Sequence, residues 1–306
     1  MARKTKKQSG VSVVLVILLV IVAAVFAYFY EDISNIIFDD NIDLDGKFAV
    51  HFIDVGQGDA ILIQNPELEF MLIDTGEGEK HIKLTGYLDK FKVKEFKYAV
   101  FTHPHADHIG SADKIVRDYK IETLIMPFAT NTSQTFKRLV AEIENKNMEI
   151  TPPVPGETFK FGDAEIIILA PFSEEYKNLN NYSVAVKITY GKHSFLFTGD
   201  MEKESENEVM EYFGNNNIKS DVLKVSHHGS TTSSQQKFLE IIDPSLAVIF
   251  VGKDNSYNHP SSQILDRLAS VNAAVLRTDL DGDIIVVSDG EVLSVKKGKN
   301  EIENLD

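Results

Sequence analysis

The stretch FTHPHADHIGS, Phe101 to Ser111, places three histidines and one aspartate within six consecutive residues. It begins at the end of KYAVFT, a run that favours β-structure, so His103 lies just past an expected strand end, where functional side chains often project. Pro104 biases His103 toward an extended conformation, in which residues two apart point to the same side. His103 and His105 can therefore converge on one metal ion.

Asp107 and His108 follow at the start of an expected amphipathic helix. Alone, Asp107 would be interpreted as the cap of that helix, because a carboxylate there accepts free backbone N–H groups. Next to three histidines, a carboxylate and an imidazole directed at a second ion is the better interpretation. The stretch as a whole predicts metal binding.

Two more expected strands end in residues of the same kind. SFLFTGD ends at Gly199 and Asp200, and DVLKV is followed by Ser226, His227 and His228. TGD alone would be an ordinary turn. Three strand ends that all carry metal-ligand residues form a more specific pattern, which suits a site with two ions.

Composition limits the ligands and the substrates. The 306 residues include no Cys, so a metal must be held by His, Asp, Glu or Asn. The formal net charge is −15, and because the first ten residues contribute +4, the remainder of the chain carries −19. A body this acidic repels polyanions unless a local groove or a bound metal reverses the field.

Residues 11–30 contain no charge and match the length of about 20 residues that a helix needs to cross a bilayer. Basic residues precede this run and acidic residues follow it, which predicts a cytoplasmic N-terminus and an extracytoplasmic body on a single-pass membrane protein. A signal peptide cleaved near VFA, residues 25–27, is the alternative and would give a secreted protein.

The organisation expected along the chain has five parts. These are a basic cytoplasmic tail (1–10), a transmembrane anchor (11–30), a juxtamembrane linker (31–46), a main domain with the predicted metal ligands (47–298) and a C-terminal tail (299–306). Within the domain, strands that first follow one another in hairpins and then alternate with helices predict an α/β sandwich, two sheets with helices outside. Periodicity alone does not separate this from a doubly wound sheet.

The motifs HPHADH, FTGD and HHGS, in this order, resemble the metallo-β-lactamase fold superfamily, which implies an αββα sandwich and a metallohydrolase. More narrowly, HFIDVGQGDAILI, MLIDTG, NNYSVAVKI and LKVSHHGS resemble the hydrolase domain of the ComEC family of competence (DNA uptake) proteins. This resemblance extends from about Phe48 to Val295. The family also has a channel region of many helices, so the chain resembles a detached, singly anchored version of the domain.

The resemblance implies two divalent ions, zinc or manganese or magnesium. His103 and His105 would bind the first ion, Asp107 and His108 the second, and Asp200 would bridge them.

One of the two consecutive histidines would complete the second site. His227 is favoured as the first residue beyond the strand and its serine, with His228 lining the pocket, although the order can be reversed. For the third ligand of the first site, the resemblance implies Asn181 or Ser183, and His193 is expected in an exposed turn. An amide or a hydroxyl there would favour Mn²⁺ or Mg²⁺ over Zn²⁺.

Other residues carry weaker signals. Asp54, Gln57 and Asp59 in DVGQGDA suit either a hairpin turn or a pocket. Asp74 in LIDTG is expected to support the metal loop from behind, and His259 to approach the substrate.

The catalytic candidates are Asp107, Asp200, His228 and His259. Two ions bridged by a carboxylate activate water for attack on phosphorus or on a carbonyl carbon. The resemblance favours a phosphodiesterase or nuclease that acts on DNA outside the cell. The acidic body and its scattered Lys and Arg residues favour a small phosphoester or a wall-linked phosphodiester, because Lys224, Lys253 and Arg277 near the pocket would attract a polyanion only weakly.

A lactone or β-lactam substrate fits the same chemistry. A non-catalytic binding domain predicts the loss of Asp107, His108 or Asp200, and the chain retains all three. The sequence leaves the oligomeric state open.

Overall fold

The computed structural model of this chain describes residues 36–38 and 43–298. The predicted basic tail, transmembrane anchor and C-terminal tail, and most of the predicted linker, lie outside the described residues. Among the residues that are described, none of the helices combines the length and the apolar character needed to span a membrane.

The described strands form two sheets. The first sheet has the order β1 (Ile36–Phe38), β16 (Leu293–Lys297), β15 (Ile284–Ser288), β2 (Phe48–Phe52), β3 (Ile61–Gln64), β4 (Phe70–Ile73), β5 (Glu95–Val100), β6 (Lys120–Ile125) and β7 (Ile150–Thr151). The second has the order β14 (Ala274–Arg277), β13 (Leu246–Ile249), β12 (Val222–Lys224), β11 (His193–Phe197), β10 (Ala185–Tyr190), β9 (Ala164–Ala170) and β8 (Thr158–Phe161).

Each sheet combines an antiparallel half with a parallel half. In the first sheet β2, β3 and β4 pair antiparallel, whereas β4, β5 and β6 run parallel. In the second, β9, β10 and β11 pair antiparallel, and β11 to β14 run parallel. Parallel strands end at the same edge of a sheet, so the loops after β4 and β5, and those after β11, β12 and β13, each emerge together.

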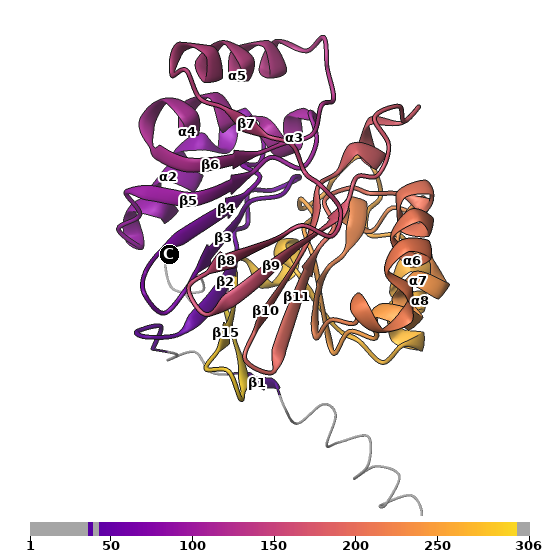
Figure 1. Cartoon of the computed structure of the whole chain (residues 1–306). Coiled ribbons are helices and arrows are strands. Elements are labelled where there is room, and N and C mark those ends of the chain that lie inside the picture. Colours follow the sequence, from indigo (N-terminus) through magenta and orange to yellow (C-terminus); the bar gives the residue numbers. More distant parts are fainter. Residues whose placement is uncertain (1–35, 39–42, 299–306) are drawn as a thin grey trace, which may run out of the picture.

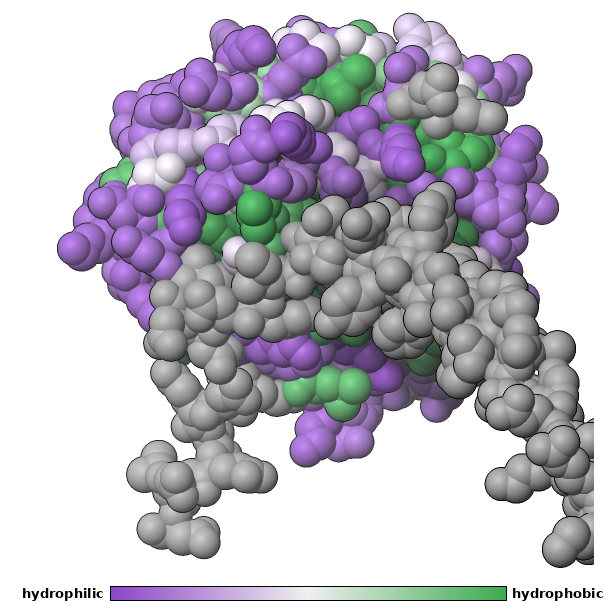
Figure 2. Space-filling model, turned by 90° about the horizontal axis from the view of Figure 1, so that it is seen from below, coloured by the Kyte–Doolittle hydropathy of each residue, from purple (hydrophilic) through white to green (hydrophobic). Residues whose placement is uncertain are grey.

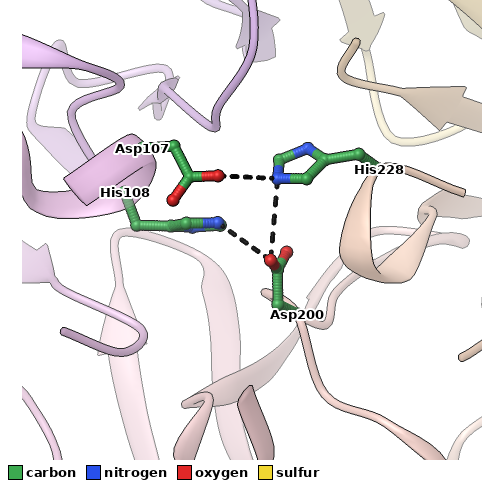
Figure 3. A group of neighbouring side chains, drawn as sticks. All are labelled: Asp107, His108, Asp200 and His228. Carbon is green, nitrogen blue, oxygen red and sulfur yellow. Dashed lines mark ion pairs between the residues drawn. The ribbon is translucent and has the colours of Figure 1, made fainter. Parts of the chain in front are cut away.

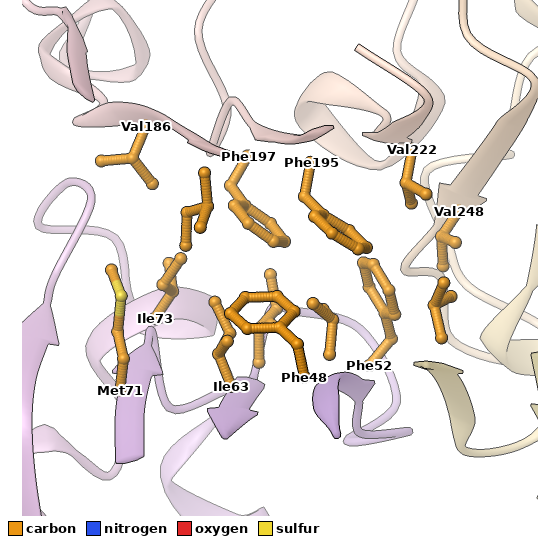
Figure 4. Packing of buried hydrophobic residues seen from close by; sticks show 14 of the residues in the cluster. Phe48, Phe52, Ile63, Met71, Ile73, Val186, Phe195, Phe197, Val222 and Val248 are labelled. Carbon is orange, nitrogen blue, oxygen red and sulfur yellow. The ribbon is translucent and has the colours of Figure 1, made fainter. Parts of the chain in front are cut away.

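The main core lies between the two sheets. Phe195 and Phe197 of the second sheet point toward Phe48 and Phe52 of the first (Figure 4), with ring centroids 5.4 Å apart for Phe48 and Phe195. Strand β2 is buried along its whole length, because one face meets the other sheet and the other face meets helices. Such strands are apolar throughout rather than alternating.

Helices cover the outer faces of both sheets (Figure 1). α2 (His81–Lys90), α4 (Ala112–Asp118) and α5 (Gln134–Asn145) lie against the first sheet, and α6 (Lys203–Asn217), α7 (Gln236–Ile242) and α8 (Ser262–Ser270) against the second. The predicted αββα sandwich is therefore confirmed. Where it is visible in Figure 2, the lower face of the sandwich is mainly hydrophilic, with hydrophobic side chains in separate patches.

Candidate metal centre

His108 is oriented by a buried carboxylate behind it. It lies in the short helix α3 (Ala106–Ile109), and its Nδ1 is 2.7 Å from Asp74 Oδ2. Asp74 follows β4 with a positive φ of 56°, and it also accepts hydrogen bonds from the backbone and hydroxyl of Thr102. A carboxylate on Nδ1 holds a proton there and directs the other nitrogen, Nε2, toward the centre. That Nε2 faces Asp200, 3.2 Å from its Oδ2.

His228 is oriented in the same manner from the second sheet. It lies in a 3₁₀ turn, η3 (Ser226–Gly229), and its Nδ1 donates to the carbonyl oxygen of Phe250 at 3.1 Å. Its Nε2 is 3.3 Å from Asp107 Oδ2 and 3.6 Å from Asp200 Oδ2. Asp200 follows β11 of the second sheet. Asp107 therefore comes from the first sheet, whereas Asp200 and His228 both come from the second.

Asp107, His108, Asp200 and His228 form one compact group, with one ligand atom from each all within 4.8 Å of one another (Figure 3). The Nε2 atoms of His108 and His228 are buried and have no hydrogen-bond partner. Buried polar atoms are almost always paired, so two unpaired imidazole nitrogens beside two carboxylates fit a cation. The residues present therefore suit a divalent metal ion.

The charges in the group reinforce one another. Burial opposes ionisation of Asp107, but the neighbouring imidazoles of His108 and His228 hold its pKa below the usual range. The same imidazoles, together with Lys224, hold the pKa of Asp200 well below its ordinary value despite its burial. Both carboxylates are thus anionic at neutral pH and available to a cation.

His103 and His105 form the second half of the predicted centre. His103 Nε2 lies 3.0 Å from His105 Nδ1 and 3.9 Å from Asp200 Oδ2, so the pair adjoins the group of four. The other nitrogen of His103 lies 3.1 Å from the Thr102 hydroxyl and 3.4 Å from that of Ser183. In the described part of the chain, these two imidazoles form a pair and do not join three or more His, Asp or Glu donors.

The amide of Asn181, a predicted third ligand of this pair, has hydrogen-bond partners elsewhere, and its ligand role stays a prediction. Its Oδ1 accepts from the Glu202 backbone N–H, and its Nδ2 donates to the Glu204 carboxylate. Its neighbour Asn180 has a buried Oδ1 without a partner. Ser183 does lie at the pair, and its hydroxyl also accepts from the Asp200 backbone N–H at 2.9 Å.

The order of the two consecutive histidines is the reverse of the favoured prediction. His228 joins the group of four, whereas His227 Nδ1 lies 3.2 Å from Glu202 Oε1 and its Nε2 is 3.9 Å from Asp200 Oδ2. Both residues have positive φ, 50° and 54°, which turns their rings apart. Strained non-glycine backbone of this kind often occurs at functional sites.

The DVGQGDA loop packs beneath the centre. Gly58 has a φ of 121°, and a Cβ there would lie 2.2 Å from the Asp107 carbonyl oxygen, so only glycine fits. Gln57 accepts from the Gly252 backbone N–H, and Asp54 accepts from that of Gly56. Asp54 and Gln57 thus hold loops together and lie outside the group of four.

Asp59 is the member of that loop that reaches the centre. It is buried, with Oδ1 3.6 Å from His228 Nδ1 and Oδ2 2.5 Å from Lys224 Nζ. Lys224 also donates to the Gly199 carbonyl oxygen at 2.7 Å and lies 3.6 Å from Asp200 Oδ1. The sequence predicted only a weak contribution from Lys224. An ionisable residue inside the apolar strand DVLKV was the available signal of its burial.

His259 borders the open side of the centre, with its ring centroid 5.9 Å from that of His227. His193 was expected in an exposed turn, but it is buried and its Nδ1 lies 2.7 Å from the Ser288 hydroxyl of β15. Glu202 was not singled out from the sequence, although it contacts His227, Asn178, Asn180 and Thr232. The ligand roles of all these residues stay predictions.

Comparisons with known proteins agree with this fold. A family model described as "Metallo-beta-lactamase superfamily" matches residues 53–253. ComE operon protein 3 of Bacillus subtilis (strain 168) is 32% identical over 260 residues, which cover 79% of this chain and 33% of that protein. Recombination protein 2 of Haemophilus influenzae is 28% identical, over 78% of this chain and 29% of that protein. The chain thus spans about a third of the length of these relatives.

Among solved structures, CmlA, a diiron β-hydroxylase from Streptomyces venezuelae, shares the fold. The TM-score is 0.52 at 13% sequence identity, with 79% of this chain and 54% of the other covered.

Proposed function

Because the chain belongs to the metallo-beta-lactamase superfamily and is a metallohydrolase of that fold, we propose that it is a phosphodiesterase whose substrate is DNA. The observation that carries the proposal is the group of Asp107, His108, Asp200 and His228, with two buried imidazole nitrogens that lack partners. Its similarity to proteins named for competence and recombination supports DNA as the substrate.

Two divalent ions would be held by this group and by His103 with His105. Ions in such a site lower the pKa of water toward neutrality and polarise a phosphoryl oxygen. The chain's own residues prepare the positions. Asp74 and the Phe250 carbonyl each hold one imidazole by its Nδ1, so that both Nε2 atoms face Asp200.

His227 and His259 supply hydrogen-bond groups on the open side of the centre. Glu202 and the Thr232 hydroxyl both lie near His227 Nδ1, at 3.2 and 3.1 Å, and hold the ring with Nε2 toward Asp200. When both of its nitrogens are protonated, a ring held in this way can donate from Nε2 to a phosphoryl oxygen or to the leaving oxygen. Asp200 lies among four imidazoles and one ammonium. This central position makes it the natural ligand to bridge the two ions.

A small phosphoester is the second candidate substrate, and one observation favours it. Residues 11–306 carry a formal charge of −19, which opposes the approach of a long polyanion. The site itself accommodates either substrate, because the reacting group is the same.

We also propose that the protein is located at the cell membrane. Residues 11–30 would anchor the protein in the cell membrane, with the catalytic domain on the outer side. The support is the uncharged run itself, between basic residues before it and acidic residues after it.

The test uses the full chain purified in detergent. Bound metal is measured, and hydrolysis of linear duplex DNA, single-stranded DNA and bis-p-nitrophenyl phosphate is followed with Mn²⁺, Mg²⁺ and Zn²⁺. We expect DNA cleavage that Asp200→Ala abolishes and that Asp89→Ala, an exposed carboxylate on α2, leaves intact. Cleavage of the small diester without cleavage of DNA would favour the second candidate, and activity that survives Asp200→Ala would contradict the proposed centre.

A further inference from the structure

A groove of about 280 Å³ differs in chemistry from the candidate metal centre, and its lining residues are not those of the centre. Five prolines, three aromatic residues (Phe128, Phe172, Tyr182) and Val154 make up most of its lining. Among the described residues that line it, Glu174 is the only charged one. The volume is at the lower end of the range for ligand pockets, about 300–1,000 Å³, so it suits a small flat group.

Both walls of the groove are tied to the His103 side of the centre. On one wall, Tyr182 directly precedes Ser183, whose hydroxyl lies 3.4 Å from His103 Nδ1. On the other wall, Phe128 begins a loop in which Asn131 donates to the Pro104 carbonyl oxygen at 3.0 Å. Pro104 separates His103 from His105, so each wall of the groove is joined to a segment that holds this pair of histidines.

The groove keeps apolar surface exposed and its walls fixed. Phe128 is 66% exposed and Val154 is 52% exposed, although large apolar side chains are usually covered. The Tyr182 hydroxyl donates to the Glu174 carbonyl oxygen and accepts from the Tyr176 backbone N–H, which holds the ring in place. A rigid aromatic wall beside a reactive centre is suited to stacking.

The charge of the lining indicates which part of a nucleotide, the phosphate or the base, the groove can bind. No Lys or Arg lines the groove and Glu174 adds a negative charge, so a phosphate group is disfavoured. A nucleobase is flat and uncharged, and each of the bases can stack on aromatic side chains. Base stacking also offers a way for a body of charge −19 to bind DNA without a basic stripe.

We propose that this groove binds a nucleobase of the substrate, next to the phosphodiester that is cleaved. The inference rests on the proposed function and narrows it, because a base must leave a duplex to enter the groove. The preferred substrates are therefore single strands and frayed ends rather than intact duplex.

The test measures binding separately from hydrolysis. The full chain in detergent, with Mn²⁺, is titrated into two fluorescent octamers with phosphorothioate linkages, one of thymidine and one abasic, and anisotropy gives the dissociation constants. Wild type, Phe128→Ala and Ile82→Ala are compared. Ile82 is an 83% exposed side chain on α2, so its loss matches the loss of exposed apolar area without touching the groove.

We expect wild type and Ile82→Ala to bind the thymidine octamer about tenfold more tightly than the abasic one. Phe128→Ala should bring that ratio close to one, with an unchanged melting temperature because the ring is mostly exposed. Equal binding of both octamers by wild type, or a ratio that Phe128→Ala does not change, would overturn the inference and favour a protein segment as the occupant. A base preference without any hydrolysis of ordinary DNA would keep the groove assignment and reject the nuclease.

Discussion

Lys224 and Asp59 form a buried ion pair that connects the two sheets directly beneath the candidate metal centre. Lys224 ends β12 in the second sheet, Asp59 lies between β2 and β3 in the first, and 2.5 Å separates Nζ from Oδ2. Both side chains are almost completely buried. Burial opposes the charge on Lys224, but Asp59 and Asp200 hold its pKa above the ordinary value. Lys224 therefore keeps its positive charge behind Asp200, whereas burial raises the pKa of Asp59 although Lys224 and the nearby imidazoles oppose that shift.

Removal of one partner of this pair should be costly. In Lys224→Met the Asp59 carboxylate is left buried without its cation, and we expect a loss of about 3–5 kcal/mol in the free energy of unfolding. Lys224→Met combined with Asp59→Asn removes both charges and should recover part of that loss. Chemical denaturation of the metal-free protein measures both. A double variant no more stable than Lys224→Met would show that the pairing of charges is not the cause.

The orientation of His108 should control metal affinity. Asp74→Asn keeps the shape of the side chain but removes the carboxylate that holds the proton on His108 Nδ1. We expect metal affinity to fall about 10- to 100-fold, the effect of losing such an outer partner. Equilibrium dialysis with metal analysis gives the dissociation constant. Asp118→Asn, at an exposed carboxylate on α4, is the matched control, and equal affinities in the two variants would contradict the role of Asp74.

The two consecutive histidines should differ in their effect on metal binding. His228 Nε2 faces Asp107 and Asp200, so His228→Ala should weaken binding of one ion by more than about 100-fold. His227→Ala should change metal affinity less than about tenfold. Calorimetric titration of the metal-free variants distinguishes them. The opposite result would restore the order that the sequence favoured.

Glu206 should make stability depend on pH. This buried residue of α6 accepts backbone hydrogen bonds from Ser234 and Gln235 at the start of α7, and burial raises its pKa to about 7. A raised folded-state pKa means that the native state holds a proton which the unfolded state releases. Stability from this group is complete below about pH 4.5 and is lost as pH rises through 7.

The measurement compares melting temperatures of wild type and Glu206→Gln between pH 4.5 and 8, in the presence of a chelator so that metal binding does not contribute. The melting temperature of wild type should fall relative to that of Glu206→Gln as pH rises through this range, because the glutamine side chain does not titrate. A constant difference would mean that Glu206 does not titrate there.

The sequence predicted the αββα sandwich and the strand ends that carry the centre, because these features depend on local patterns. His103, His105, Asp107 and His108 lie within one short segment, and Asp200 follows an apolar strand, so the motifs themselves indicated their proximity. What packs behind them depends on contacts between the sheets. The burial of Lys224 follows from its contact with Asp59, more than 150 residues earlier in the chain.

Backbone conformation and contacts made by side chains explain the other differences between the sequence predictions and the structure. Which of His227 and His228 joins the group of four depends on two successive residues with positive φ, a conformation that is uncommon for non-glycine residues although histidine adopts it more often than most. The amide of Asn181 is used to hold Glu202 and Glu204, contacts that the sequence did not indicate. His193 is buried because the turn before β11 packs on β15, a contact between the two sheets.

The division of the group of four between the sheets has a consequence for synthesis of the protein. Asp107 and His108 are synthesised soon after β5 of the first sheet, whereas Asp200 and His228 are synthesised only after β11 and β12 of the second. A chain that is still incomplete, or a sandwich whose layers have separated, holds only half of the centre. Hydrolytic activity should therefore arise in a single late step, when the two sheets pack against each other. A folding defect in either sheet should abolish it.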